Sequence, residues 1–463
     1  MFLSRRPAFL ALSLGLILVT AGVSADPLCE NIVEQTPRQG DLECVERWID
    51  VEQSWPTGAK QEAKALLNKL RQDAEGLTDA EYYLSVARLV ALADNGHTGL
   101  SLAAARKAFG LLPIRTFFFG DGLFIVRAAT QHRELVGAQV LAIGGLSPEG
   151  LMDTMRAYLG GPAESFKSYA HTVLLLSPAL LQAAGVSESA DQVSVDVRLI
   201  GGERRTVDLG IYQGDKQPAS YPWRNLHPDP IRGEQDDWIS WSTKAGAELP
   251  WALQEPSKLF RYRYLPDSRL AHIQFRANIS SDDEDIKDFQ DELKRRLKAD
   301  RPRYVLWDQR WNTGGDLSKT ADFSRRLHDW LPKDGLVYVA TSQATFSAGI
   351  YTAFFPEWAD DERTVVVGSR AGDRERFWAE SRDPIVLPQS DWRIYYSLQM
   401  HDLAEGCNDR KRCHLRKKRW KVAVGSFEPD VEIPFLSEHI PAGRDAVYEH
   451  VVAAIESDVE ATR

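Results

Sequence analysis

Two short segments carry side chains that could perform acyl transfer. Residues 308–315 read Asp-x-Arg-x-Asn-x-Gly-Gly and follow an apolar stretch, and residues 345–349 read Thr-Phe-Ser-Ala-Gly and open a predicted helix. A serine at a strand-to-helix crossing can serve as a nucleophile, and a glycine loop can supply oxyanion donors. The pair therefore favours acyl-transfer chemistry with Ser347 as the nucleophile, whereas Ser347 taken alone could also be a helix N-cap.

The oxyanion site is predicted from both segments. The first turn of a helix leaves backbone N–H groups unpaired, and the helix dipole favours negative charge there. Ala348 and Gly349 are small and leave room for a substrate carbonyl. The paired glycines Gly314 and Gly315 permit a close backbone approach. We therefore expect the N–H of one of them to point at the oxyanion beside that of Ala348.

The elements that must position these residues form several parts. Helical spacing of apolar residues extends to about Asp94, and short apolar runs between turn signals follow from Leu111 to Leu209, interrupted by a helical insertion from Pro148 to Leu181. From Leu259 onward strands and helices alternate, which indicates an α/β layer structure. We expect a signal peptide at 1–25, a helical region at 26–105, a β module at 106–215, a linker or irregular cover at 216–258 and the α/β core at 259–463.

The start of the chain predicts export. Arg5 and Arg6 precede an apolar run over 8–21 and small residues up to Ala25, which is typical of a secretory signal peptide. No later segment has the roughly 18 consecutive apolar residues that a membrane helix needs. A periplasmic or secreted location without a membrane span is therefore predicted.

Four cysteines in an exported chain predict two disulfides. Proximity in sequence favours Cys29 with Cys44 and Cys407 with Cys413, although four cysteines allow three connectivities.

Composition excludes several classes of function. The formal net charge of -10 argues against generic nucleic-acid binding, which depends on a basic patch. The four cysteines and ten histidines show no zinc-like ligand spacing, so no metal or cofactor is expected.

Together with His97, in the turn Asp94-x-x-His97-Thr98, these segments resemble the tail-specific, or carboxy-terminal-processing, serine proteases and their tricorn-type relatives. The resemblance covers most of the mature chain. It depends on the order of several motifs, which are the turn at 94–98, the run at 137–145 typical of a PDZ-like domain, the glycine loop, the Ser347 segment, Val367-Gly368, Leu387-Pro388, residues 428–431 and residues 443–445. It implies a Clp-protease/crotonase-like α/β core with an N-terminal helical region and a PDZ-like β module.

The family resemblance also implies a catalytic base. Its Ser-Lys members place a lysine about 25 residues after the serine, but residues 372–380 contain no lysine. Arginine cannot replace it, because its pKa above ~12 leaves no neutral base. His97 stands where the Ser-His members keep their histidine, and an imidazole suits proton transfer at neutral pH. For the third residue, which orients the imidazole, Glu380 is the first candidate and Glu405 the second.

The resulting prediction is an exported serine endopeptidase that needs no cofactor and acts on a polypeptide substrate. The PDZ-like module implies recognition of an exposed carboxy terminus by strand addition. Two rival functions use the same fold, a carrier of a small hydrophobic ligand and an inactive scaffold that docks partners through the PDZ-like module. The sequence does not specify the oligomeric state or the physiological substrate.

Overall fold

The structure is a computed structural model that describes residues 27–29, 32, 36–213, 222–227, 238–380, 383–414 and 421–462. The predicted signal peptide at 1–25 lies outside these residues. Within the described ranges no helix combines the length and apolar character needed to cross a bilayer. Both predicted disulfides, Cys29–Cys44 and Cys407–Cys413, are present.

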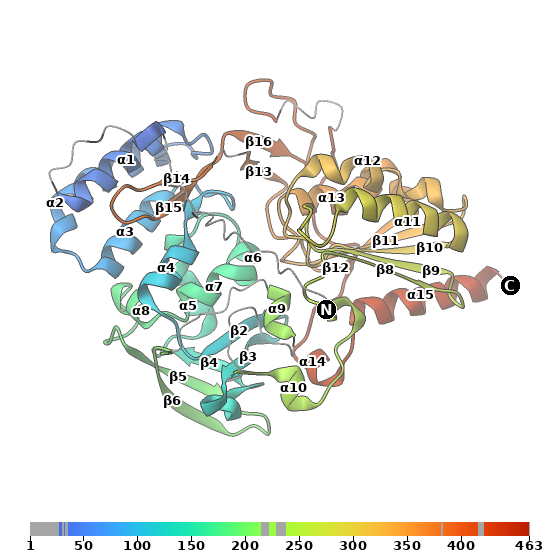
Figure 1. Ribbon diagram of the computed structural model, residues 1–463, viewed down its shortest axis with the longest axis horizontal. Coiled ribbons are helices and arrows are strands. Elements are labelled where there is room, and N and C mark those ends of the chain that lie inside the picture. The colour runs from blue at the N-terminus through green and yellow to red at the C-terminus, as the bar shows by residue number, and fades with distance from the viewer. Residues whose placement is uncertain are drawn as a thin grey trace, which may run out of the picture.

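A six-stranded sheet forms the core of the carboxy-terminal half (Figure 1). Five of its strands run parallel, and β8 pairs antiparallel with β9 at one edge. In spatial order the strands are β17 (Val431–Glu432), β12 (Thr364–Gly368), β11 (Leu336–Thr341), β10 (Tyr304–Asp308), β9 (Leu270–Phe275) and β8 (Phe260–Leu265). Strands and helices alternate in this half of the chain, as predicted from Leu259 onward.

Helices cover both faces of this sheet, as Figure 1 shows. Alternate strand residues face opposite layers because side chains in a strand alternate in direction. Val305 and Trp307 pack in the cluster that includes α11 and α13, whereas Tyr304 and Leu306 pack with α15. The helices in this half of the chain are α11 (Ile286–Asp300), α12 (Ala321–Ser324), α13 (Ala348–Ala359), α14 (His439–Ala442) and α15 (Ala446–Thr462).

The amino-terminal region is helical, as predicted. Thr78 is the N-cap of α3 and forms a capping box with Glu81. Tyr83, Val86 and Leu89 on α3 are buried, as their spacing predicts. The helices are α1 (Pro37–Val51), α2 (Ala59–Asp73), α3 (Asp79–Ala91) and α4 (Leu102–Phe109).

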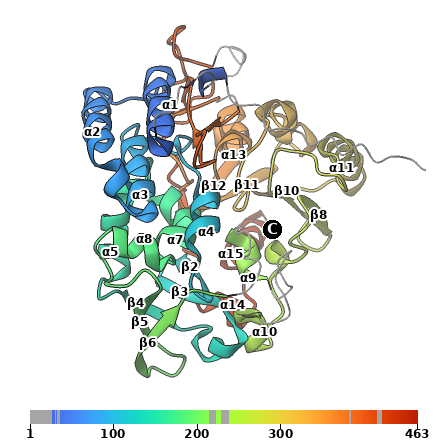
Figure 2. The same cartoon turned by 60° about the vertical axis from the view of Figure 1, so that its left-hand side comes forward.

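A second six-stranded sheet forms the β module, which lies beneath the amino-terminal helices in Figure 2. Its strands are β2 (Ile114–Phe119), β3 (Gly122–Ala129), β4 (Gln139–Ile143), β5 (Gln192–Arg198), β6 (Arg204–Gly210) and β7 (Trp238–Ser240). The predicted helical insertion is present as α5 (Pro148–Met155), α6 (Ala163–Ser165), α7 (His171–Leu174) and α8 (Pro178–Ala183).

The region expected to be a linker or irregular cover contains regular structure. It holds α9 (Pro222–Leu226), strand β7 and α10 (Trp241–Ala245), and β7 pairs antiparallel with β3. A strand of three residues is too short to give a periodic pattern, so its sequence carried no strand signal.

Two small sheets lie beside these, and the first joins the two halves of the chain. In the first, β1 (Gly99–Leu100) pairs with β15 (Arg393–Tyr395), which pairs with β14 (Ile385–Val386). In the second, β13 (Arg376–Ala379) pairs antiparallel with β16 (Gln399–Asp402). The first sheet brings the turn that contains His97 to the carboxy-terminal half.

Candidate active site

Ser347 lies at the crossing from β11 into α13 and has a rare backbone conformation. Its φ is 56° and its ψ is -130°, and its side chain makes no capping hydrogen bond to the helix. A non-glycine residue in such a conformation stores strain, and a strained turn from strand to helix exposes the nucleophilic serine of α/β-hydrolases. The geometry therefore disfavours a role as a plain N-cap.

The glycine loop lies against this crossing. Gly314 and Gly315 have φ values of 101° and 132°, which side chains rarely adopt. A Cβ on Gly314 would lie 2.6 Å from the Cβ of Ser347, and a Cβ on Gly315 would lie 2.9 Å from the Asn278 carbonyl oxygen. Only glycine permits this approach at both positions.

The backbone N–H groups near Ser347 differ in their hydrogen bonds. The N–H of Gly314 donates to Oδ1 of Asn312 at 3.0 Å. Among the described residues, the N–H groups of Gly315 and Ala348 have no acceptor. These two donors are therefore available to an oxyanion, and Gly314 contributes to the shape of the loop.

A buried amide network holds the loop on the start of α13. Asn312 donates from Nδ2 to Oδ1 of Asn278 at 2.9 Å and to Oε1 of Gln309 at 2.8 Å. Asn278 in turn donates to the Ala348 carbonyl oxygen at 3.0 Å. The packing is close, since a Cβ on Gly349 would lie 2.3 Å from the Asn312 carbonyl oxygen. The loop and helix are thus fixed as one unit.

An ion-pair network anchors the start of the loop. Arg310 donates to both Asp308 and Asp445, with N–O distances of 2.7 Å to each. Burial alone would raise the pKa of Asp308, but the Arg310 guanidinium holds it well below its ordinary value. Asp308 therefore stays ionised and keeps Arg310 in place.

His97 is held against the carboxy-terminal half by the residues around it. Asn95 accepts from the N–H of Trp378 at 3.1 Å and donates to the Trp378 carbonyl oxygen at 3.0 Å. Asp94 pairs with Arg374 at 2.9 Å. Together with the pairing of β1 and β15, these contacts fix the turn beside α13.

The imidazole of His97 stacks on the residue that precedes the serine. Its ring centroid is 4.4 Å from that of Phe346 and 5.4 Å from that of Phe377. Nδ1 lies 3.5 Å from Oδ2 of Asp373, whose side chain is 2% exposed. Neither ring nitrogen makes a hydrogen bond with any described residue, so Ser347 and His97 are not hydrogen-bonded in this state.

The two carboxylates expected to orient His97 occupy other places. Glu380 lies 3.4 Å from Nε2 of His401 and 3.6 Å from Nδ1 of His414. Glu405 is exposed in the turn after β16. The carboxylate next to His97 Nδ1 is Asp373, which sequence reasoning did not select. Only a weak signal in the sequence points to Asp373, which lies within residues 372–380, where the Ser-Lys members of the family would have their lysine.

Ser347 borders a cavity of about 340 Å³. Its lining includes Tyr351, Glu380, His401 and His414. His97 lines a neighbouring cavity of about 630 Å³ that also borders Glu380. Histidines therefore line both cavities, His401 and His414 in the first and His97 in the second. The sequence analysis selected only His97.

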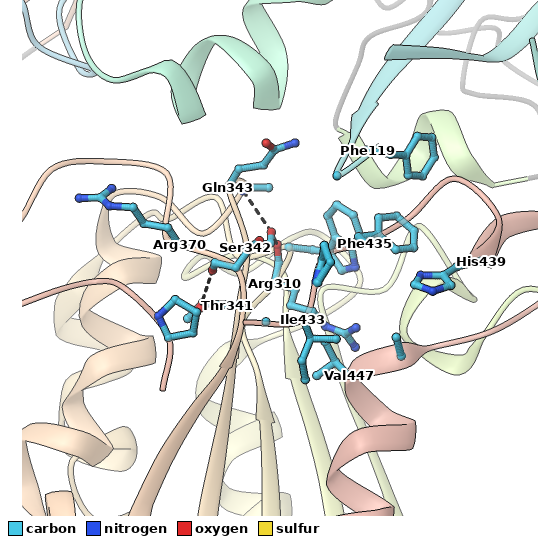
Figure 3. Close-up of a pocket in the computed structure, with 18 of the residues that line it drawn as sticks. Phe119, Arg310, Thr341, Ser342, Gln343, Arg370, Ile433, Phe435, His439 and Val447 are labelled. Atoms are coloured by element: carbon cyan, nitrogen blue, oxygen red, sulfur yellow. Dashed lines mark hydrogen bonds between the residues drawn. The ribbon is translucent and has the colours of Figure 1, made fainter. Parts of the chain in front are cut away.

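A further cavity of about 400 Å³ lies away from Ser347 (Figure 3). It is bounded by Phe119 of the β module, by Arg310 and Ser342 at the ends of core strands, and by Phe435. Much of its wall is aromatic or aliphatic.

Comparison with known proteins establishes the fold. Mature CPAF in complex with lactacystin aligns over 93% of this chain and 98% of its own, with a TM-score of 0.53 and 12% identity. Mature CPAF also aligns over 92% and 96%, with a TM-score of 0.50 and 13% identity. The photosystem II D1 C-terminal processing protease matches over 89% and 99% at a TM-score of 0.39 and 13% identity. No family model and no curated protein matches the chain.

This chain has the fold of mature CPAF. The predicted fold class, an α/β core with an amino-terminal helical region and a β module, is thereby confirmed. At 12% and 13% identity the likeness to CPAF concerns the fold, and the chemistry must be argued from the residues of this chain.

Proposed function

We propose that the protein is an exported serine peptidase that hydrolyses peptide bonds through Ser347. The observation that carries the proposal is the strained start of α13. There Ser347 lies beside two backbone donors, Gly315 and Ala348, that have no acceptor among the described residues. Two disulfides fit an exported protein.

In the proposed mechanism Ser347 Oγ attacks the carbonyl carbon of the scissile bond while His97 Nε2 accepts the hydroxyl proton. The carbonyl oxygen becomes an oxyanion and accepts hydrogen bonds from Gly315 and Ala348. His97 then gives its proton to the leaving amine as the C–N bond breaks, and a water molecule hydrolyses the acyl-enzyme by the same route.

Asp373 is the proposed third residue in place of Glu380. Its carboxylate lies at the His97 nitrogen opposite the one that would face Ser347, so it can stabilise the imidazolium. The hydrogen bond between Ser347 and His97 would form when substrate binds, since catalytic hydrogen bonds are often long in the free enzyme.

A fluorophosphonate probe tests the nucleophile. The folded protein is expected to be labelled at Ser347, as located by mass spectrometry, and Ser347→Ala should abolish both labelling and hydrolysis of an unstructured polypeptide. Ser318→Ala is a matched control, because Ser318 lines the same cavity without the strained conformation. Absence of labelling in the folded wild-type protein would refute the proposal.

A non-catalytic carrier of a small hydrophobic ligand is a second candidate function. The aromatic cavity of about 400 Å³ beside Phe119 and Phe435 favours it, because its size suits a small apolar ligand. Native mass spectrometry of the purified protein checks this candidate. A stoichiometric apolar ligand together with an unlabelled Ser347 would support the carrier, and labelling at Ser347 would reject it.

A further inference from the structure

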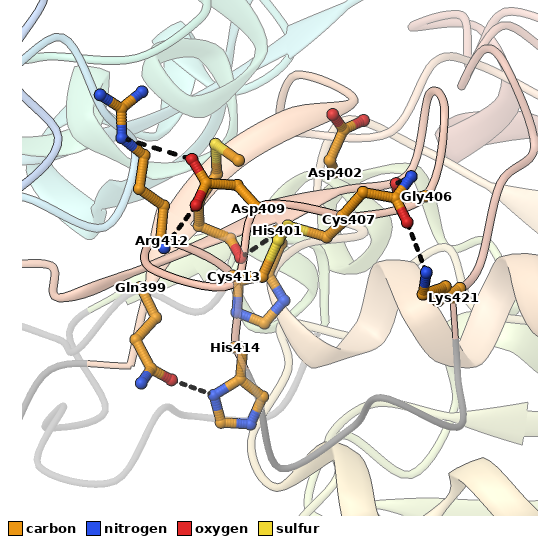
Figure 4. The surroundings of a disulfide bond; sticks show 12 residues. Gln399, His401, Asp402, Gly406, Cys407, Asp409, Arg412, Cys413, His414 and Lys421 are labelled. Atoms are coloured by element: carbon orange, nitrogen blue, oxygen red, sulfur yellow. Dashed lines mark hydrogen bonds and ion pairs between the residues drawn. A yellow bond between two sulfur atoms is a disulfide. The ribbon is translucent and has the colours of Figure 1, made fainter.

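Three potential metal ligands converge on the cavity that Ser347 borders. They are the carboxylate of Glu380 and the imidazoles of His401 and His414, and one ligand atom from each lies within 4.8 Å of the others. Figure 4 shows the two histidine side chains near the Cys407–Cys413 disulfide. No step of the proposed mechanism uses these three residues.

Their separations suit metal coordination better than direct hydrogen bonding. Glu380 lies 3.4 Å from Nε2 of His401 and 3.6 Å from Nδ1 of His414. Hydrogen bonds between nitrogen and oxygen measure roughly 2.7–3.2 Å. Two ligands that each lie about 2.1 Å from a tetrahedral Zn²⁺ are about 3.4 Å apart. The spacing of Glu380 and His401 therefore already matches that of two ligands on one Zn²⁺ ion.

The backbone that carries the ligands is fixed by pairing and by a disulfide. His401 lies on β16 opposite Phe377 of β13, and Glu380 directly follows β13. The N–H of His414 donates to the Met400 carbonyl oxygen at 3.1 Å, which places His414 beside β16. Cys413 is tied to Cys407 immediately before His414. Such rigid placement limits the entropy lost when a metal binds.

An outer partner orients the imidazole of His401. The hydroxyl of Tyr351 lies 3.0 Å from Nδ1 of His401. When Nδ1–H of His401 donates to this oxygen, Nε2 presents its lone pair toward Glu380. The side-chain oxygen of Gln399 contacts Nδ1 of His414, so metal binding at that nitrogen requires the Gln399 side chain to turn away.

We propose that Glu380, His401 and His414 form a binding site for a divalent transition metal ion, with Zn²⁺ the best match. Two imidazoles and one carboxylate are a common ligand set for zinc, and three protein ligands leave a fourth position open toward the cavity. The expectation of no metal came from local spacing, but here the ligands come from separate segments that the fold brings together. The site does not require Ser347 to be a nucleophile.

Metal binding to the full exported chain tests this site. The protein is stripped with a chelator, and Zn²⁺ binding is then measured by calorimetry and by competition with a chromophoric chelator. We expect one tightly bound Zn²⁺ per chain. His414→Ala and Glu380→Gln should weaken binding by about 100-fold or more, and Tyr351→Phe by about 10-fold, as expected for an outer partner of a ligand. Mg²⁺, which prefers oxygen ligands, should not compete.

Matched controls separate this result from its alternatives. His132→Ala removes a histidine from the turn at Thr130–Leu135 and should leave Zn²⁺ binding unchanged. Ser347→Ala should bind Zn²⁺ like the wild type even if the proposed peptidase activity fails. Zn²⁺ should raise the unfolding temperature of the wild type but not of Glu380→Gln, which also shows that the variant is folded. Equal affinity in wild type, His414→Ala and Glu380→Gln would overturn the site, as would absence of binding in the wild type.

Discussion

Two histidines near Ser347 stack on the same ring, Phe377, yet they have different surroundings. His97 stacks at 5.4 Å with one carboxylate, Asp373, at Nδ1, and its ring nitrogens make no hydrogen bond with any described residue. His401 stacks at 4.9 Å, contacts the hydroxyl of Tyr351 at Nδ1 and faces a carboxylate and a second imidazole.

The difference shows how partners decide what an imidazole can do. A single carboxylate at one nitrogen leaves the other nitrogen able to exchange a proton with a hydroxyl, as in a Ser-His-acid triad. A hydroxyl at one nitrogen, with a carboxylate and a second imidazole at the other, orients a lone pair into a set of ligands. We therefore assign proton transfer to His97 and metal binding to His401.

The largest expected effect comes from replacing the base. His97→Ala should lower kcat/KM for a peptide substrate by about 10⁴-fold, at the upper end of what a general base contributes. His401→Ala is the matched variant and should lower it by less than about 10-fold. Steady-state kinetics of both variants check this, and the reverse order would make His401 the base and break the comparison.

The next effect concerns the orienting carboxylate. Asp373→Asn keeps the shape of the side chain but removes the charge that stabilises the imidazolium, so kcat should fall by about 10²–10³-fold with KM nearly unchanged. Glu380→Gln should leave kcat within about 10-fold of wild type. A large kcat effect for Glu380→Gln with none for Asp373→Asn would restore Glu380 as the third residue.

The sequence predicts some of these features and not others. The alternating strands and helices of the core, the helical amino-terminal region and the strand-to-helix crossing at Ser347 follow from local patterns, and each lies where the sequence places it. Asp373 escapes such reasoning because it meets His97 only after β1 pairs with β15 and Asn95 bonds to Trp378.

The cluster of Glu380, His401 and His414 was not predicted for a related reason. Glu380, His401 and His414 have no zinc-like spacing along the chain, and they converge only when β13 pairs with β16 and Cys413 pairs with Cys407. Likewise, the sequence predicts that the paired glycines lie near the serine, but it does not show that Asn312 accepts from the N–H of Gly314 while that of Gly315 has no acceptor among the described residues.

A smaller effect is expected from the ring that both groups share. Phe377→Leu keeps an apolar side chain but removes the stacking with both imidazoles, and such contacts are worth about 0.5–1.5 kcal/mol. We expect kcat/KM and Zn²⁺ affinity each to fall by up to about 10-fold. If only kcat/KM falls, Phe377 positions only His97, and if only Zn²⁺ affinity falls, it positions only His401.

The smallest effect on the reaction should come from the disulfide beside His414. Replacing Cys407 and Cys413 by serine frees a short loop, which should lower the free energy of unfolding by about 2 kcal/mol. Zn²⁺ affinity should fall a few-fold, because His414 directly follows Cys413 and loses part of its fixed placement. Labelling of Ser347 by the fluorophosphonate probe should not change, since His97 is held by Asn95 and β1 on other segments. Loss of labelling in this variant would mean that the reactivity of Ser347 depends on the cluster of Glu380, His401 and His414 as well as on His97, which would contradict the separate roles proposed for them.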